Sequence, residues 1–534
     1  MIERVIIKNY KCIKYADITF DESKNIIVGN NGVGKSTLIE ALTLALGYGL
    51  NKFEITPHIF NLECIQDYKE NKVLPEILIE VYFSGELGVL SGNNNSIHKV
   101  KNGLYFKVSF DNVYDELYAI EKEKNPQLHL PCEYYKKERM WFSQQPVLKY
   151  KMPFLVQVVD TSSMYFSSSS NQYINQLIER YLGDEDTTTI KTSLRHLKEN
   201  FDEAKEIREV NKKITEQRKG LSLSIDVTSR IDKRDIMCPF IDEIPVSQMG
   251  AGDICHLKAI LALGKTEQKK KVVIIEEPES HLSHTKMYEM IRDIQTKIDD
   301  TCQVFITTHN SFVANKLDLS KLILLENSQN KMNAFKLEED DYVNAFFGKV
   351  CHYPTLRMIL AHAVILVEGP ADEMVTTYSY YKDYNGRHPF DDGIELIVVN
   401  GTAFKAYVHL MKNFKTKVAI VTDNDGLDEI ALKKKRGIEN LPNNIRLFCD
   451  FDIVKNRTLE PSFVHANREN LQDFSDYVRI RKKNADTEEE LIDYMLSNKT
   501  DWSYKLLTQI ESINFKVPSY IKEAIKWVKS DGKE

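Results

Sequence analysis

The chain has 534 residues, of which 42% are hydrophobic and 28% charged, and its formal net charge is −7. This length is several times that of one cooperative domain, so we expect at least two domains with separate cores. No apolar run reaches the roughly 18 residues that a membrane helix needs, and the acidic balance gives no overall attraction to nucleic acid. Binding to DNA would therefore depend on local basic patches.

The first 20 residues alternate apolar and polar side chains and lack the basic start and cleavage site of a signal peptide. We therefore expect them to form strands and the protein to stay in the cytoplasm. The eight cysteines are scattered, without a CxxC pair or a His/Cys cluster at zinc-ligand spacing, so we expect mostly buried free thiols.

A glycine-rich run at 29–37, GNNGVGKST, lies between a strand predicted at 25–28 and a helix predicted from Lys35 toward Gly47. It matches the GxxxxGK[ST] phosphate-binding pattern in the strand–loop–helix context that this pattern requires. In such a loop the backbone N–H groups surround the phosphates, the lysine reaches the terminal phosphates and the serine hydroxyl ligates magnesium. The predicted ATP-binding residues are Asn30, Asn31, Gly32, Gly34, Lys35, Ser36 and Thr37, with Ser36 also a metal ligand.

A charged stretch from about 171 to 217 has apolar positions at helical spacing, which predicts a helical insert at about 165–220. Its apolar stripe is sparse. A protruding hairpin or dimer contact and a solvated helix without a partner are equally compatible with this pattern.

Another buried strand is predicted at 272–277, and it ends in the adjacent carboxylates Glu276 and Glu277. Glu276 would hold magnesium through water, and Glu277 would orient or deprotonate the water that attacks the γ-phosphate. A solvated acidic turn at the end of a strand is the alternative.

A further strand at 305–308 precedes His309. The P-loop, the EEPESHL run and this TTH strand end together resemble the ATP-binding-cassette (ABC) ATPases that maintain chromosomes and repair breaks. The resemblance implies that His309 senses the γ-phosphate. It also implies a head-to-head dimer in which Gly250 and Gly252 of the QMGAGD run cap the partner's ATP. Ala251 departs from the family pattern, in which a hydroxyl-bearing residue is usual, so slow turnover is expected.

A second series of alternating strands and helices starts at 364, which places a domain boundary near His352. The predicted domains are 1–350 and 351–534. The strands of the second series end in turns with polar residues, and ligands bind at the carboxyl ends of strands in an open parallel sheet.

Four carboxylates occupy these turns. Glu368 follows one strand and Asp372 lies in the helix after it, whereas Asp423 and Asp425 follow another strand. If the backbone stays extended there, both aspartates face the same cation. Carboxylates without His or Cys prefer Mg²⁺ or Mn²⁺, the ions of phosphoryl transfer. An EF-hand starting at Asp423 is excluded by its spacing, and a plain acidic turn remains the alternative.

Glu368, the Gly401 turn and the DxD pair resemble a Toprim domain, the metal-binding module of topoisomerases, primases and certain nucleases. Behind an ABC-type ATPase, this order resembles the overcoming-lysogenisation-defect (OLD) nucleases over nearly the full length. The implied fold is α/β, an N-terminal ABC-type P-loop ATPase with a helical dimerisation insert followed by a C-terminal Toprim domain with a Rossmann-like parallel sheet. The implied metal ligands are Glu368, Asp372, Asp423, Asp425 and, more weakly, Glu460.

The resemblance also places Lys499 near the scissile phosphate, although a solvated helix lysine is an equal alternative. It implies a DNA endonuclease of bacterial anti-phage defence that uses ATP and Mg²⁺ or Mn²⁺. The expected assembly is a homodimer or higher homo-oligomer, with a partner encoded nearby: a helicase, as in Gabija systems, or a reverse transcriptase with structured RNA, as in retrons. The alternative is an ATP-gated DNA-binding or tethering ATPase, or a toxin, whose Toprim domain is regulatory or topoisomerase- or primase-like.

Overall fold

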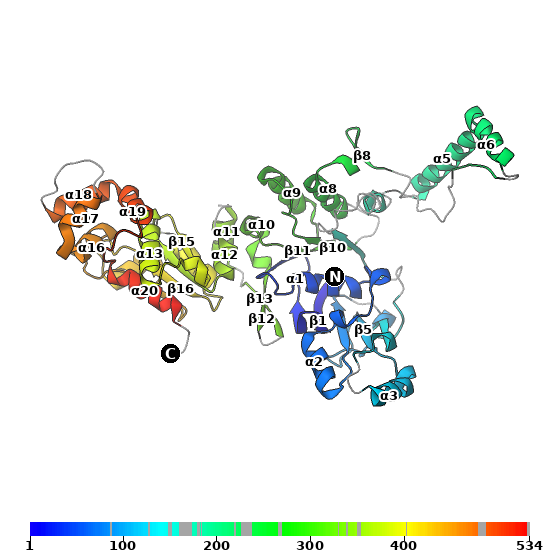
Figure 1. The fold of residues 1–534 in the computed structure, drawn as a ribbon, viewed down its shortest axis with the longest axis horizontal. Coiled ribbons are helices and arrows are strands. Elements are labelled where there is room, and N and C mark those ends of the chain that lie inside the picture. The colour runs from blue at the N-terminus through cyan, green and yellow to red at the C-terminus, as the bar shows by residue number, and fades with distance from the viewer. Residues whose placement is uncertain are drawn as a thin grey trace. The chain divides into compact units, whose positions relative to one another are not determined.

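The computed structural model describes residues 1–85, 88–125, 129–147, 152–159, 173–178, 182, 184–217, 221–225, 238–264, 270–328, 331–337, 340–349, 354–401, 403–478 and 487–530 (Figure 1). The chain divides into two compact units. The first comprises Met1–Val313 and Lys321–Lys336, and the second comprises Ala314–Ser320 and Leu337–Glu534. The boundary expected near His352 lies outside the described residues.

The first unit contains an 11-stranded sheet with the order β6-β5-β4-β1-β2-β13-β12-β3-β11-β10-β7. Its strands are β1 (Ile2–Tyr10), β2 (Ile13–Thr19), β3 (Lys24–Val28), β4 (Ile77–Phe83), β5 (Gly103–Phe110), β6 (Tyr135–Trp141), β7 (Leu155–Val159), β10 (Lys271–Glu276), β11 (Cys302–Thr307), β12 (Leu322–Ser328) and β13 (Lys331–Lys336). Strands β6 to β2 pair antiparallel, whereas β12, β3, β11, β10 and β7 are parallel neighbours. A short hairpin, β8 (Phe240–Ile241) and β9 (Ile244–Pro245), stands apart from this sheet.

Most residues of the parallel strands are apolar and buried, as is usual where helices cover both faces of a parallel sheet. Ile27 pairs with Thr307, which also pairs with Glu276, so β3, β11 and β10 end at one level of the sheet. The helices of this unit are α1 (Lys35–Ala45), α2 (Leu62–Asn71), α3 (Asp115–Lys124), α5 (Asp184–Glu203), α6 (Lys205–Gln217), α8 (Ala251–Leu263) and α9 (His284–Lys297); α10 (Ser311–Leu317) crosses into the second unit.

The second unit contains a four-stranded parallel sheet with the order β15-β14-β16-β17. Its strands are β14 (Ala363–Val367), β15 (Ile394–Val398), β16 (Lys417–Val421) and β17 (Ile445–Phe448). The chain passes from β14 to β15 on one side and then to β16 on the other. The strand order therefore reverses between β14 and β16, and the carboxyl ends of strands at such a reversal are where open parallel sheets commonly bind ligands.

The helices of the second unit are α11 (Asp341–Lys349), α12 (Thr355–Leu360), α13 (Pro370–Asp383), α14 (Phe404–Met411), α15 (Glu429–Arg436), α16 (Leu459–Ala466), α17 (Leu471–Val478), α18 (Glu488–Ser497), α19 (Lys499–Thr508) and α20 (Ser519–Lys529). Helix α20 packs on β14, β16 and β17, and α13 packs against α19 and α20. Their apolar faces form a core around the buried Phe463 and Trp502. Within the described residues, every helix is too short or too polar to cross a bilayer.

Candidate functional site

The loop between β3 and α1 has the backbone conformation of a phosphate-binding loop. Gly32 and Gly34 have φ angles of 77° and 108°, which side chains rarely adopt. A Cβ atom on Gly34 would lie 2.6 Å from Met332 Cε and 2.9 Å from Cys12 Sγ, whereas one on Gly32 would meet nothing within 4 Å. Glycine is therefore required at position 34 for both its conformation and its lack of a side chain.

Lys35 begins α1 and is buried against this loop. Its Nζ donates to the carbonyl oxygens of Gly29 at 2.8 Å and Asn30 at 3.1 Å. Burial lowers the pKa of Lys35, and the nearby Glu277 carboxylate opposes that shift. The other predicted phosphate-binding residues lie on the same loop and first helical turn, and Asn30, Asn31, Gly32 and Ser36 are exposed, whereas Thr37 is half-buried.

Glu276 ends β10 directly beside Thr307 of β11. Glu277 follows with a positive φ of 43°, and its backbone N–H donates to the Thr307 carbonyl at 3.0 Å. Its Oε1 lies 3.3 Å from His309 Nε2. The structure thus brings Lys35, Glu277 and His309 together beyond the ends of β3, β10 and β11.

Glu279 is a member of this site that the sequence analysis missed. Its Oε1 accepts from Thr308 Oγ1 at 2.6 Å and from the backbone N–H of His309 at 3.0 Å. Glu279 therefore fixes the turn that carries His309. Its position two residues after Glu277, in the EEPESHL run, was the available signal.

Gly250 and Gly252 lie at the N-terminus of α8. A Cβ atom on Gly252 would lie 2.6 Å from the His281 carbonyl oxygen and 2.8 Å from Leu282 Cδ2, so α8 packs closely on that turn. In the described part of this single chain, the atoms nearest these two glycines do not belong to the P-loop. That Gly250 and Gly252 cap the nucleotide of a second copy therefore stays a prediction.

Asp372 and Asp423 form the centre of a second site, beyond the carboxyl ends of β14 and β16. Asp372 Oδ2 accepts from the backbone N–H of Gly369 at 3.1 Å. In the described structure, Asp372 Oδ1 and Asp423 Oδ1 are buried and have no hydrogen-bond partner. Burial raises the pKa of Asp372 to about 7, helped by Glu368. Burial also raises the pKa of Asp423 to about 8, helped by Asp372. Two neighbouring orphaned carboxylate oxygens are a place where a divalent cation would compensate buried negative charge.

Glu368 and Asp425 are instead held by basic side chains. Glu368 Oε2 accepts from Arg436 Nη2 and from Thr422 Oγ1, both at 2.8 Å. Asp425 Oδ2 accepts from the same Arg436 nitrogen at 3.2 Å and from Lys435 Nζ at 2.9 Å. One guanidinium therefore connects the end of β14 with the DxD turn.

The assumption that the DxD backbone stays extended is wrong. Strand β16 ends at Val421, and Asp425 has a left-handed φ of 54°. The Asn424 side chain accepts from the backbone N–H of Gly426 at 2.7 Å, which turns the chain. Asp423 and Asp425 consequently have different surroundings, although Glu368 adds to the effect of burial in raising the pKa of Asp423 and shares Arg436 with Asp425.

Glu460 in α16 and Lys499 at the start of α19 complete this site. The Glu460 side chain is buried, accepts from Thr458 Oγ1 at 2.8 Å and lies 3.4 Å from Lys499 Nζ. Burial lowers the pKa of Lys499, but Glu460 and then Asp423 outweigh it, and the net shift is upward. The lysine is therefore a stable cation within reach of the acidic cluster.

Among the residues that the structure describes, no three His, Cys, Asp or Glu side chains are already grouped so that they could hold a metal ion. The contacts above explain this. Asp372 and Asp423 offer free oxygens, whereas Glu368, Asp425 and Glu460 face Arg436, Lys435 and Lys499. Glu368, Asp425 and Glu460 could ligate a cation only after these basic side chains move away from them.

Arg436 is the residue of this cluster that the sequence analysis missed. It ends the run KKKR in α15, which is typical of a solvated helix end. However, Leu432 and Arg436 are both buried and stand four residues apart, on one face of the helix. The guanidinium carbon lies 5.6 Å from the centre of the Phe404 ring.

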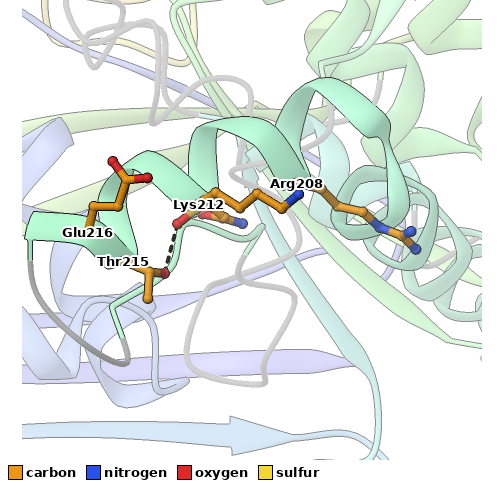
Figure 2. Close-up of a pocket in the computed structure, with 5 residues that line it drawn as sticks. Arg208, Lys212, Thr215 and Glu216 are labelled. Atoms are coloured by element: carbon orange, nitrogen blue, oxygen red, sulfur yellow. Dashed lines mark hydrogen bonds between the residues drawn. The ribbon is translucent and has the colours of Figure 1, made fainter.

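A shallow open hollow lies elsewhere, on α6. The residues drawn in Figure 2 come from this one helix: Arg208, Asn211, Lys212, Thr215 and Glu216. Thr215 Oγ1 donates to the Asn211 carbonyl within the helix at 2.8 Å. This hollow has neither a phosphate-binding loop, as the first site has, nor a cluster of carboxylates, as the second site has. We therefore do not assign a function to it.

Two family models match the chain. Residues 1–314 match the model described as "AAA ATPase domain", and residues 359–425 match "Overcoming lysogenization defect protein-like, TOPRIM domain". These matches confirm the expected α/β fold class, an N-terminal P-loop ATPase followed by a C-terminal Toprim domain. The P-loop site lies in the first region, and Glu368, Asp372, Asp423 and Asp425 lie in the second. The dimerisation role of the helical insert stays a prediction.

Curated relatives share one or both regions. The chain is 22% identical to "Endonuclease GajA" of Bacillus cereus (strain VD045) over 470 residues, which cover 81% of this chain and 75% of that protein. It is 40% identical to "DNA replication and repair protein RecF" of Mannheimia succiniciproducens over 63 residues, 12% of this chain and 17% of that protein. Among solved structures, an SMC head bound to the C-terminal winged-helix domain of ScpA matches with a TM-score of 0.34 and 12% identity, over 63% of this chain and 98% of that one.

Proposed function

Because this chain belongs to the OLD family of ATPase–Toprim nucleases, we propose that it is an ATP-hydrolysing, divalent-metal-dependent DNA endonuclease. The observation that carries the proposal is the pair of orphaned oxygens of Asp372 and Asp423 at the strand-order reversal. Open parallel sheets bind ligands beyond the strand ends at such a reversal, and carboxylate oxygens there are suitable ligands for Mg²⁺ or Mn²⁺.

In the ATPase unit, the loop from Asn30 to Gly34 surrounds the phosphates and Lys35 binds the terminal ones. Ser36 and Glu276 would hold Mg²⁺, which neutralises charge on the phosphate oxygens. Glu277 orients the attacking water and, with His309 3.3 Å away, responds to the γ-phosphate. Capping of the nucleotide by Gly250 and Gly252 of a second copy would make the active form a homo-oligomer.

In the Toprim unit, Asp372 and Asp423 would hold the metal, with Glu368, Asp425 and Glu460 as further ligands. A divalent ion there supplies an activated water and charge stabilisation for phosphodiester cleavage. Lys499, whose pKa is raised by Glu460 and Asp423 against the effect of burial, contributes a positive charge for the scissile phosphate. The named activity of the Bacillus cereus relative supports this assignment.

We also propose that the protein acts in bacterial anti-phage defence, in the cytoplasm, and its likeness to the OLD nucleases supports this. A gene product encoded nearby would complete the system, either a helicase or a reverse transcriptase with structured RNA. Co-purification with the neighbouring gene product tests this part of the proposal independently of the chemistry.

The nuclease assignment is tested by nicking of supercoiled plasmid with Mg²⁺ or Mn²⁺. Asp423→Asn should reduce nicking by about 100-fold or more, because it removes a carboxylate on which the metal site depends. Glu439→Gln is the matched control, since Glu439 is an exposed carboxylate of the same unit and should leave nicking unchanged.

Nicking by Asp423→Asn at the parent rate would show the assignment to be wrong and would favour an ATP-gated binding or tethering protein. Lys35→Ala, which should abolish ATP hydrolysis, decides the role of the nucleotide in the same assay. Loss of nicking would make ATP an activator, and stronger nicking would make it a restraint.

A further inference from the structure

Two exposed basic side chains flank the DxD turn at residues 423–426. Lys435 approaches from α15, its Nζ 2.9 Å from Asp425 Oδ2, and its side chain is 49% exposed. Arg457 approaches from the loop before α16 and is exposed. A Cβ atom on Gly426 would lie 3.4 Å from Arg457 Nε, so the arginine lies directly beside the turn.

The loop that carries Arg457 is tied to the DxD turn. The Asn424 side chain is buried and donates to the carbonyl oxygens of Asp450 at 2.5 Å and Asn456 at 2.8 Å. The Arg457 carbonyl accepts from the backbone N–H of Asp425 at 3.2 Å. The position of Arg457 next to the acidic cluster is therefore set by hydrogen bonds of buried and backbone groups, not by chance proximity.

A phosphate backbone approaching this cluster meets unfavourable charge. The chain carries a net charge of −7, and five carboxylates gather here, so a bound strand needs positive charges next to the site. Basic residues at the C-terminus of α15 also interact favourably with the helix dipole, which would account for a lysine at position 435 even if it did not bind DNA. That explanation does not extend to Arg457, which lies outside the helix.

We propose that Lys435 and Arg457 bind the phosphates of the DNA strand that enters the Toprim site. This inference rests on the proposed nuclease function and names the contacts that hold its substrate. The contacts go to the backbone, so they are independent of base sequence, and they position a phosphodiester beside Asp423.

The test measures binding of a fluorescent duplex by the full chain in EDTA, without cutting, between about 50 and 200 mM KCl. Removal of one phosphate contact should flatten the slope of log affinity against log salt by about 1, as expected for one released counterion. We expect this change of slope for Lys435→Ala and for Arg457→Ala. For the double variant the slope should flatten by about 2. Lys435→Arg and Arg457→Lys keep the charge and should keep the slope.

Lys516→Ala is the matched control, because Lys516 is an exposed lysine that pairs with Glu469. Its slope should equal that of the parent. Thermal melting confirms that each variant is folded. If the double variant keeps the parent slope while the parent nicks plasmid, this inference is wrong and the nuclease assignment stands. If the parent neither binds nor nicks DNA, both are wrong.

Discussion

The buried guanidinium of Arg436 is the residue on which the arrangement of the acidic cluster depends. Its side chain is inaccessible to solvent and binds Glu368 and Asp425, each about 70% buried. Removal of one partner from a buried ion pair leaves uncompensated charge. We expect Arg436→Met, which keeps the side-chain volume, to destabilise the second unit by about 3 kcal/mol. Urea unfolding of the full chain measures the change.

Arg436→Lys separates charge from geometry in this experiment. Lysine keeps the positive charge, but its side chain is shorter and ends in a compact ammonium group that would not occupy the position of Nη2 between Glu368 and Asp425, so an intermediate loss of stability is expected. Mn²⁺ should restore part of the stability of Arg436→Met, because a cation then compensates Glu368 and Asp425. Equal stability of the parent and Arg436→Met would show that Arg436 does not organise the cluster.

At the scale of elements, the loop between β3 and α1 allows a side-chain clash to be separated from backbone strain. Gly34→Ala should weaken ATP binding more than Gly32→Ala, because both have a positive φ but only position 34 faces Met332 and Cys12. A strained backbone position costs about 1–3 kcal/mol, and the clash adds to it. Binding of a fluorescent ATP analogue gives both values. Equal losses would mean that only the backbone conformation matters at position 34.

The elements also show where sequence reasoning succeeds. The P-loop and the strands β10, β14 and β16, which lead to Glu277, Glu368 and Asp423, were predictable, because glycine spacing and long apolar runs are local signals. Strand β17, with four residues, was not predicted, since so short a run has little periodicity. The turn at Asp425 depends on the Asn424 side chain, and the burial of Arg436 depends on packing between distant residues. The alternation of apolar and polar residues along a strand predicts neither the turn at Asp425 nor the burial of Arg436.

At the scale of the whole molecule, the two sites belong to separate compact units, each with its own sheet. Mutations at sites that share no contacting residues usually have additive effects. We therefore expect a double dissociation. Glu277→Gln should lower ATP hydrolysis about 100-fold, as expected for the loss of a general base. Its affinity for Mn²⁺ without nucleotide, followed by electron paramagnetic resonance, should equal that of the parent.

Asp423→Asn should show the opposite pattern, with weaker Mn²⁺ binding at the Toprim site and unchanged affinity for a fluorescent ATP analogue. The physical reason is that the orphaned oxygen of Asp423 contributes to the second site, whereas Glu277 contacts His309 and acts on Lys35 in the first. Glu439→Gln again serves as the control for a lost surface carboxylate. A change of more than about tenfold in Mn²⁺ affinity on Glu277→Gln would exceed the usual error of additivity and would mean that the units share their energetics even without nucleotide. In that case the ATPase and nuclease sites would already be coupled in the protein without ligands. If the Mn²⁺ affinity does not change, any coupling between ATP hydrolysis and DNA cleavage arises only when nucleotide or DNA is bound.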